Sequence, residues 1–269
     1  MSTLPWRIDL LGGLRVTHGE RVLARFRTEK TGALLGYLAC HPGTGHPREA
    51  LADLLWPDSD PEASHNSLRV ALSSLRRQLE PPGVDPGTLL VASRATVGLN
   101  PQVVTTDVAD FQEALEAARR TTDADARAGH LGRAAGLYQG PLLPGVYEEW
   151  VLPECERLAE QLLAALKELA AYHGQAGDFP LALDYARRAV AADPLREDAH
   201  RELMRLYALA GDPQAALREY RRLQRVLSAE LGTTPDDATR ALMRGIRQGT
   251  FPPAGKPAVA PAAPAPPPP

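Results

Sequence analysis

The feature that most constrains how this chain can fold is a repeat in its second half. Gly177-Asp178 recurs as Gly211-Asp212, and Ala182-Leu183 recurs as Ala216-Leu217. Both pairs return after 34 residues, within a segment whose apolar residues keep helical spacing throughout. A period of this length is typical of stacked pairs of antiparallel helices, which bury a continuous core only by packing on one another. We therefore predict a helical repeat array over residues 107 to about 247.

The length of this period is that of the tetratricopeptide repeat, and two prolines fit the assignment. Asp193-Pro194 and Thr234-Pro235 fall after the second helix of each pair, where such repeats place a proline. An arginine-rich stretch of the last repeat could receive an acidic segment of a partner. Its members are Arg218, Arg221, Arg222 and Arg225. A solvated helix face is the simpler interpretation, because Glu219, Tyr220 and Leu223 are interleaved with these arginines.

The first hundred residues change from strand spacing to helical spacing. Alternating residues around glycine turns predict short antiparallel strands at 7–10, 14–17 and 22–23. Helical spacing then predicts a first helix from Thr28 to about residue 40 and a second helix that starts at Pro47. A third helix is predicted from Pro61 to about Glu80, with Asp60 as its cap.

Two further strands, at 89–92 and 96–99, are predicted to form a hairpin. Strands, three helices and a closing hairpin are the layout of a winged helix-turn-helix module. The predicted fold is therefore mainly α with small β elements, an N-terminal winged helix-turn-helix followed by a tetratricopeptide-like α-helical repeat domain. The predicted domains are 5–100 for the winged helix, 105–248 for the repeats and 252–269 for a disordered tail or linker rich in proline and alanine.

The third predicted helix has an outward face typical of DNA recognition. Leu68, Leu72, Leu75 and Leu79 share one stripe, which we expect to pack inward. No acidic residue occurs between the first turn of this helix and its last residue. In the major groove, arginine can bind guanine, asparagine can bind adenine, and valine can contact the thymine methyl group. The predicted DNA-contacting residues of this helix are Asn66, Arg69, Val70, Ser73, Ser74 and Arg77.

Two neighbouring segments could add contacts to the DNA backbone. Arg94 lies at the predicted hairpin tip, from which a wing can reach a minor groove or a phosphate. Thr28 and Lys30, at the start of the first helix, could meet a phosphate, because a helix N-terminus favours anions. The alternatives that the sequence leaves open are an ordinary amphipathic helix and a solvated loop arginine.

Charge and composition show which classes of binding partner and which cellular locations the sequence favours or disfavours. The net charge of -3 does not exclude DNA, because residues 1–100 carry a balance of +1 and residues 101–252 a balance of -5. Aromatic residues make up 5% of the chain, which disfavours binding of single strands by stacking. No apolar run is long enough for a membrane helix, and the first residues lack export-signal features. We therefore expect a cytoplasmic protein without membrane contact.

The sequence predicts neither a catalytic site nor a metal site. Cys40, His41 and His46 lie close together but fit no zinc pattern, and a turn explains their spacing. There is no Gly-x-Ser-x-Gly elbow, no His-Glu-x-x-His pair and no dinucleotide-binding fingerprint. We therefore predict a protein that is not an enzyme and has no cofactor or metal. Cys40 and Cys155 are expected to be ordinary buried thiols.

Several segments are similar to one family of bacterial regulators. In the first half they are Leu54–Asp58, Asn66–Arg69 and Leu75–Leu79. In the second half the similarity is more specific, and the segments are Tyr138–Gly145, Trp150, Asp193–Glu197, Tyr220, Glu230–Gly232 and Pro235. Together they resemble the Streptomyces antibiotic regulatory protein type of transcriptional activator. In that family an OmpR-like winged helix precedes a bacterial transcriptional activator domain, and the resemblance covers nearly all of residues 5–248.

This resemblance implies a cytoplasmic, nucleoid-associated activator that binds direct repeats in double-stranded DNA near promoters and recruits RNA polymerase holoenzyme. It also implies that the third helix enters the major groove, and it allows a homodimer. The chain has no receiver-like segment and no Gly-x-x-x-x-Gly-Lys-Ser/Thr motif, so neither phosphorelay control nor a nucleotide-binding module is expected in it. The alternative is a tetratricopeptide-type adaptor with a degenerate winged helix, which would bind no duplex at any salt concentration.

Overall fold

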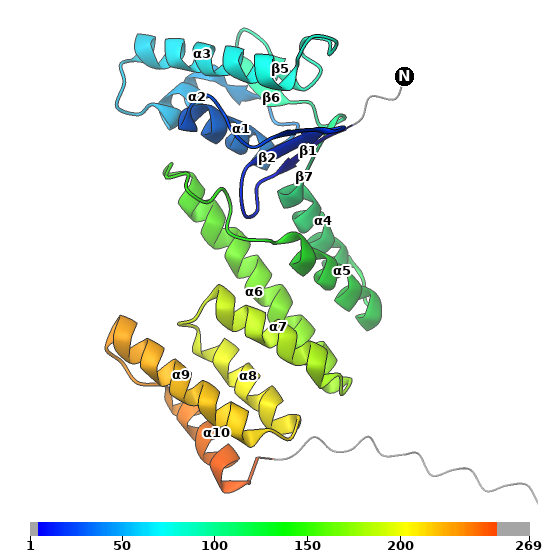
Figure 1. The fold of residues 1–269 in the computed structure, drawn as a ribbon, viewed down its shortest axis with the longest axis vertical. Coiled ribbons are helices and arrows are strands. Elements are labelled where there is room, and N and C mark those ends of the chain that lie inside the picture. Colours follow the sequence, from blue (N-terminus) through cyan, green and yellow to red (C-terminus); the bar gives the residue numbers. More distant parts are fainter. Residues whose placement is uncertain (1–4, 252–269) are drawn as a thin grey trace, which may run out of the picture. The chain divides into compact units, whose positions relative to one another are not determined.

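The computed structural model describes residues 5–251, and the chain divides into two compact units. The first unit ends at Ala165 and the second begins at Leu166, so that the division falls within a long helix. The predicted tail, 252–269, lies outside the described residues. The predicted fold class is confirmed, because a winged helix with small sheets precedes a series of helical repeats (Figure 1).

The first sheet of unit 1 combines the N-terminal strands with one strand from much later in the chain. Its strands are β1 (Trp6–Asp9), β2 (Arg15–His18), β3 (Arg21–Leu23) and β7 (Val104–Thr106). The first three form the antiparallel meander that the sequence predicts. β7 pairs in parallel with β1, which gives the order β3-β2-β1-β7. The sequence did not predict β7, because three residues are too few to show a strand period.

Three helices follow in unit 1, and side-chain caps fix where two of them begin. They are α1 (Glu29–Cys40), α2 (Arg48–Leu55) and α3 (Pro61–Leu79). Thr28 caps α1 by accepting a backbone hydrogen bond at 3.1 Å, and Asp60 caps α3 in the same way at 2.9 Å. Pro61 is the first residue of α3, as predicted. Pro47 is not the first residue of α2, because it belongs to a short strand that precedes this helix.

The second sheet contains the wing. Its strands are β4 (His46–Pro47), β5 (Leu90–Ala92) and β6 (Thr96–Leu99), in the order β4-β6-β5. The predicted hairpin is therefore confirmed, and the unpredicted β4 pairs with its second strand. A Cβ atom on Gly98 of β6 would lie 2.5 Å from the carbonyl oxygen of Thr44. The wing is thus packed closely against the segment that leads into α2.

The rest of unit 1 is helical and is attached to the first sheet by backbone hydrogen bonds. Its elements are α4 (Asp107–Arg120), α5 (Ala124–Leu137) and the first part of α6 (Val151–Gln175). The buried carboxylate of Asp107 accepts hydrogen bonds from the backbone N–H groups of Leu10 at 2.8 Å and Leu11 at 2.7 Å. The N–H of Leu143 donates to the carbonyl oxygen of Leu10 at 2.9 Å. The first compact unit therefore extends beyond the predicted winged-helix domain of 5–100 and includes the first helices of the predicted domain 105–248.

Unit 2 consists of the helix pairs that the repeat predicts. After the second part of α6 come α7 (Phe179–Ala192), α8 (Glu197–Leu209), α9 (Pro213–Leu231) and α10 (Asp237–Gln248). Gly177 and Gly211 have φ angles of +78° and +84°, which favour glycine. The aspartates that follow them, Asp178 and Asp212, cap α7 and α9. The repeated pair therefore marks the same turn in successive helix pairs.

Candidate nucleic-acid interface

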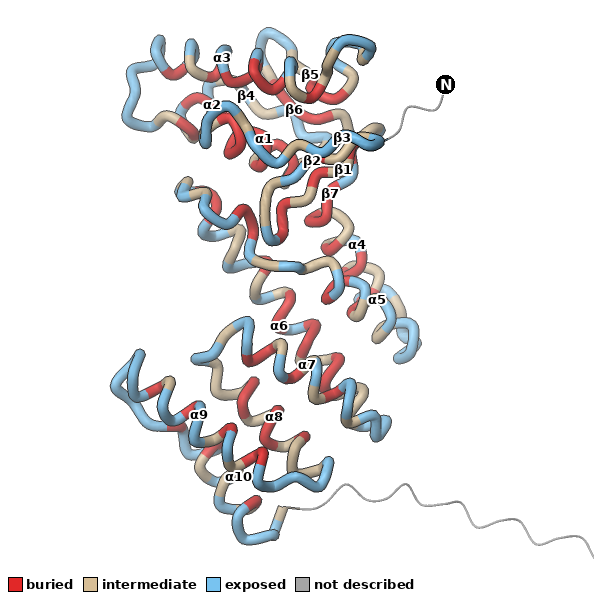
Figure 2. The backbone as a smooth tube through the Cα atoms, in the orientation of Figure 1, coloured by how far each residue is buried: buried red, intermediate tan, exposed pale blue. Residues whose placement is uncertain are grey.

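The helix α3 buries one side and exposes the other, as the sequence predicts. Leu68, Leu72, Leu75 and Leu79 are at most 3% exposed. The side of the helix opposite this stripe is open to solvent and carries Asn66, Val70, Ser73 and Arg77, and Arg69 is also exposed. Figure 2 shows buried and exposed residues alternating along α3, where it lies across α1 and α2. Val70 is 48% exposed, so its side chain is accessible on this face.

Ser74 is a correction to the predicted set, because it is buried. Its exposed fraction is 3%, whereas the helical wheel placed it beside the outward face. The reason is that α1 packs against this flank of α3, where Thr31 and Ser74 line the same hollow. A wheel that assumes one buried stripe cannot show this second neighbour. Ser74 therefore positions α3 against α1 and presents no surface to DNA.

The start of α1 and the outward face of α3 border a hollow of about 320 Å³, and the predicted Thr28, Lys30, Asn66 and Val70 all line it. The Thr28 hydroxyl is used in the helix cap, and Lys30 Nζ forms an ion pair with Glu148 at 3.0 Å. Lys30 therefore does not offer an unpaired charge here.

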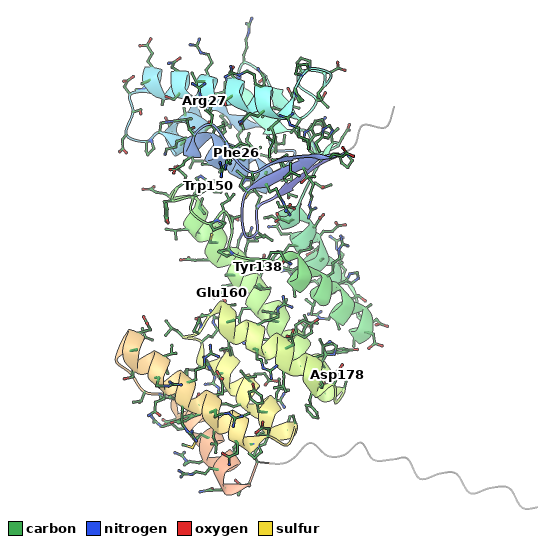
Figure 3. The ribbon with its side chains drawn as sticks, viewed as in Figure 1. Phe26, Arg27, Tyr138, Trp150, Glu160 and Asp178 are labelled. Carbon is green, nitrogen blue, oxygen red and sulfur yellow. The ribbon has the colours of Figure 1, made fainter. Side chains whose placement is uncertain are left out.

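Arg27 also lines this hollow and is exposed, just before the cap of α1 (Figure 3). Arg27 is not among the residues predicted from the sequence. The sequence does contain a signal for Arg27, because a basic residue directly before the cap of a predicted helix can contact the same phosphate as the helix N-terminus.

The wing brings Arg94 to the other flank of α3. Arg94 is exposed at the turn between β5 and β6. Together with Arg48, His65 and Arg69 it lines a groove of about 550 Å³ between the wing and α3. Arg48 Nε donates to the carbonyl oxygen of Ser93 at 3.0 Å, which ties the wing tip to the start of α2. Arg48 is not among the predicted residues either, because its position beside the wing depends on a long-range contact.

The charge of this surface matches DNA. The acids of α3 and its cap, Asp60 and Glu62, lie at the N-terminal end, and none follows within the helix. Outside α3, the exposed Glu49 of α2 lines the groove beside the wing. Asn66 Oδ1 accepts a hydrogen bond from an Arg69 Nη atom at 2.8 Å, so these two side chains are held together on the exposed face. Arginine, asparagine and valine on one open helix face are groups that recognise base edges. We define the recognition surface by the exposed residues of α3 and three flanking arginines. Its members are Asn66, Arg69, Val70, Ser73 and Arg77 of α3, with Arg27, Arg48 and Arg94 on the flanks.

The arginine-rich stretch of the last repeat lies on α9 and is not part of this surface. Arg218, Arg221, Arg222 and Arg225 are all exposed. Their ion-pair contacts are long, at 3.7 Å from Arg218 to Asp212 and 3.8 Å from Arg222 to Glu219.

Tyr37, His41 and His46, near Cys40 in the sequence, form a packed ring cluster in unit 1. Tyr37 contacts both His41 and His46, with ring centroids at 5.1 Å and 4.9 Å. Burial raises the pKa of the Cys40 thiol to about 12, so that the thiol stays protonated. Burial and the neighbouring His41 lower the pKa of His46. In residues 5–251 no three His, Cys, Asp or Glu side chains are grouped as metal ligands would be. None of the helices described is both long and apolar enough to span a membrane.

Two family models match the chain. The model described as "bacterial transcriptional activator domain" matches residues 106–247, and the model described as "transcriptional regulatory protein, C terminal" matches residues 26–95. The second match runs from just before α1 to the wing tip, and the first runs through the helices from α4 onward.

Curated relatives match along most of the chain. Regulatory protein AfsR of Streptomyces coelicolor is 30% identical over 90% of this chain and 24% of its own length. Transcriptional regulatory protein EmbR of Mycobacterium bovis is 27% identical over 91% of this chain and 64% of its own length. The solved structure of Mycobacterium tuberculosis EmbR in complex with a low affinity phosphopeptide has a TM-score of 0.70 and 25% identity, and the match covers 91% of this chain and 65% of that one. The chain therefore spans less than two thirds of the length of these relatives.

A winged helix whose exposed third helix carries no acid beyond its first turn, followed by helical repeats, defines a class of DNA-binding transcriptional regulators. The chain belongs to the bacterial transcriptional activator domain family. With its OmpR-like winged helix, it is a regulator of the Streptomyces antibiotic regulatory protein type.

Proposed function

We propose that the chain activates transcription by binding direct repeats near promoters and by recruiting RNA polymerase holoenzyme through its helical repeats. The observation that carries the DNA-binding part is the outward face of α3, where Asn66, Val70, Ser73 and Arg77 are exposed without an acid among them. In winged helices of this layout, that helix enters the major groove.

Each part of the recognition surface has its own task in this proposal. Arg77 and Asn66 bind base edges, as arginine does with guanine and asparagine with adenine, and Val70 contacts a thymine methyl group. Arg94 reaches the backbone or the minor groove beside the wing, and Thr28 lies nearest the phosphates at the start of α1. Lys30 contributes only if DNA draws it away from Glu148, because the two are paired in the unbound protein.

The partners follow from this activity. The protein acts in the cytoplasm, on the nucleoid, and two copies on adjacent repeats form a homodimer on DNA. RNA polymerase is the partner of the helical repeats, which commonly bind other proteins through extended surfaces.

The experiment that tests this function maps the genomic fragments that the purified protein retains at moderate salt. A titration then compares the best fragment with a scrambled duplex. A direct-repeat motif near promoters, with affinity that falls steeply as salt is added, is the expected result, because several phosphate contacts release counterions. Equal retention of scrambled DNA, or no binding at low salt, would contradict DNA recognition. It would favour the adaptor, whose partner is then sought with unit 2.

A further inference from the structure

We propose that the hollow between α1 and α3 binds a small aromatic carboxylate that also carries a hydroxyl group, and that this ligand competes with DNA. The ligand site rests on the hollow itself, whereas the competition rests on the proposed DNA binding. The hollow has a volume of about 320 Å³, near the lower end of the range of about 300–1,000 Å³ that is typical of small-molecule sites. It lies within unit 1 and is lined by the start of α1, by α3 and by Trp56, the residue after α2.

The buried end of the hollow carries a hydroxyl group without a partner. Ser74 is 3% exposed and lines the hollow, and its Oγ forms no hydrogen bond with any of residues 5–251. Thr31 also lines the hollow and is 2% exposed, but its hydroxyl is satisfied by the hydroxyl of Thr28 at 2.8 Å. Most buried polar groups have a hydrogen-bond partner, and leaving one without a partner costs free energy. The Ser74 hydroxyl is therefore available to a polar group of a ligand.

Apolar side chains form much of the wall of the hollow. Trp56, Val70 and Ala71 all line it. Ala71 is 5% exposed and Val70 is 48% exposed, so the apolar wall extends from the buried end to the outward face of α3. A planar ring packs well against a tryptophan, and burying it removes apolar surface from water. The wall therefore favours a ligand with a flat, aromatic body.

The charge at the rim of the hollow favours an anionic group on the ligand. Arg27 and Lys30 line the hollow at the start of α1, and none of the described residues in its lining is acidic. Arg27, labelled in Figure 3, is exposed and forms no ion pair with any described residue, whereas Lys30 is paired with Glu148. The start of a helix adds partial positive charge. An arginine beside a helix start suits a carboxylate, which can accept two parallel hydrogen bonds from the guanidinium.

A DNA duplex alone does not account for the buried part of the hollow. Asn66 and Val70 are exposed, and a duplex that lies on the outward face of α3 can reach them. Ala71 and Ser74 are at most 5% exposed, so a small molecule can contact them where a duplex cannot. A ligand in the hollow also covers Asn66 and Val70, which the proposed function assigns to base edges. Ligand and DNA therefore compete, and each weakens the binding of the other by the same factor.

The first test measures ligand binding to the full chain without DNA, by amide NMR spectra that report both affinity and place. The probes are para-hydroxybenzoate and 6-hydroxy-2-naphthoate, which differ in length. With at least one probe we expect saturable shifts of the Thr31 and Ser74 signals and a dissociation constant of about 1 mM or below. The uncharged amide of that probe is expected to bind about ten-fold more weakly. No saturable shift of these signals with either probe, or equal affinity of acid and amide, would overturn the proposed site.

Variants paired with probes test which groups of the hollow hold the ligand. Ser74→Ala removes the unpartnered hydroxyl, so it is expected to weaken binding of the hydroxy acid about five-fold and to leave binding of the same acid without its hydroxyl unchanged. Arg27→Gln is expected to remove most of the preference for the acid over its amide. Ser64→Ala is the control, because Ser64 is also buried on α3 but lies outside the hollow. Parent-like affinity in Ser74→Ala, or an equal loss in Ser64→Ala, would overturn the inference.

A competition experiment separates the ligand site from the proposed function. At a probe concentration ten times its own dissociation constant, the apparent dissociation constant for the specific duplex is expected to rise about ten-fold. Sodium acetate at the same concentration controls for the effect of added salt. Ser74→Ala is expected to bind the duplex as the parent does and to need about five-fold more probe for the same competition.

Each outcome of this experiment has a distinct meaning. A parent that binds the probe in the hollow but binds no duplex supports the ligand site and contradicts the proposed DNA binding. A parent whose affinity for the duplex does not change at saturating probe overturns the competition. A parent that binds the duplex but shows no saturable probe binding overturns the ligand site and leaves the DNA-binding function standing.

Discussion

Asp107 is the side chain on which the attachment of α4 to the first sheet depends. Its carboxylate is 4% exposed and accepts hydrogen bonds from the N–H groups of Leu10, Leu11 and Val108. Asp107→Ala would leave these buried donors without a partner, and we expect the free energy of unfolding to fall by about 2–4 kcal/mol. Urea denaturation measures the change. Asp85→Ala, in an exposed loop, is the matched control, and an equal loss in both variants would contradict the role of Asp107.

The same carboxylate makes a prediction about pH. Burial raises the pKa of Asp107, although the hydrogen bonds from Leu11 and Leu10 act against this rise. An acid with a raised pKa favours the folded state most when it is protonated. Its contribution is fully present below the ordinary value of 3.8 and is lost as the pH rises through the folded-state pKa. We therefore expect the stability of the parent relative to Asp107→Asn to fall as the pH rises above the ordinary value of 3.8 and through the raised pKa of the folded state. A flat or rising difference between the two urea curves would contradict the raised pKa.

Among the secondary-structure elements, α3 carries the proposed DNA contacts and allows binding to be separated from folding. Asn66 and Arg77 are exposed on its outward face, so replacing either with alanine should leave the fold intact. We expect Arg77→Ala and Asn66→Ala each to weaken binding to the specific duplex by about 1–3 kcal/mol and to relax the preference for one base pair. Titrations on specific and scrambled duplexes measure both effects.

The control for α3 is an arginine of unit 1 that lies outside the recognition surface. Arg133 is exposed on α5, so Arg133→Ala removes the same charge without touching α3. Its affinity for the specific duplex should stay near that of the parent. Parent-like affinity in both α3 variants would show that the recognition surface has been assigned to the wrong face.

The wing is the element in which we expect a single added methyl group to lower the free energy of unfolding most. A Cβ atom on Gly98 would meet the backbone oxygen of Thr44 at 2.5 Å, and a backbone atom cannot move aside as a side-chain end can. We expect Gly98→Ala to lower the free energy of unfolding by about 1–3 kcal/mol. Gly129 of α5 has no heavy atom within 4 Å of its added Cβ, so Gly129→Ala should stabilise by about 0.5–1 kcal/mol. Thermal unfolding of the two variants checks the opposite signs.

The elements show what local sequence can and cannot predict. Helices were predicted well, because spacing and caps such as Asp60 are local signals. The short strands β4 and β7 were missed, since each depends on a partner strand more than forty residues away. The same limit applies to the recognition surface, where the buried position of Ser74 depends on α1 and the role of Arg48 depends on the wing.

At the scale of the whole molecule, the repeat predicted the helical part but not where the compact units divide. A period of 34 residues marks which turns are equivalent, and it carries no information about what the helices before the first repeat pack against. The hydrogen bonds of Leu10 with Asp107 and Leu143 join segments about 100 residues apart or more. Contacts of that range leave no pattern in a single sequence. The winged helix therefore packs against segments that lie outside its own hundred residues.

This attachment leads to a prediction about fragments of the chain. A fragment that ends at residue 100 lacks β7, which pairs with β1, and also lacks Asp107, which satisfies the amides of Leu10 and Leu11. Residues 1–175 keep both and also contain the whole of α6. We expect the shorter fragment to be less stable by about 3 kcal/mol or more, because it exposes a sheet edge and buried apolar side chains. Urea unfolding followed by tryptophan fluorescence measures the difference, since both fragments contain Trp56 and Trp6, and Trp6 is 2% exposed in the intact chain. Asp107→Ala in the longer fragment should lower its stability toward that of the shorter one. Equal midpoints for the two fragments would mean that the winged helix folds without its helical neighbours.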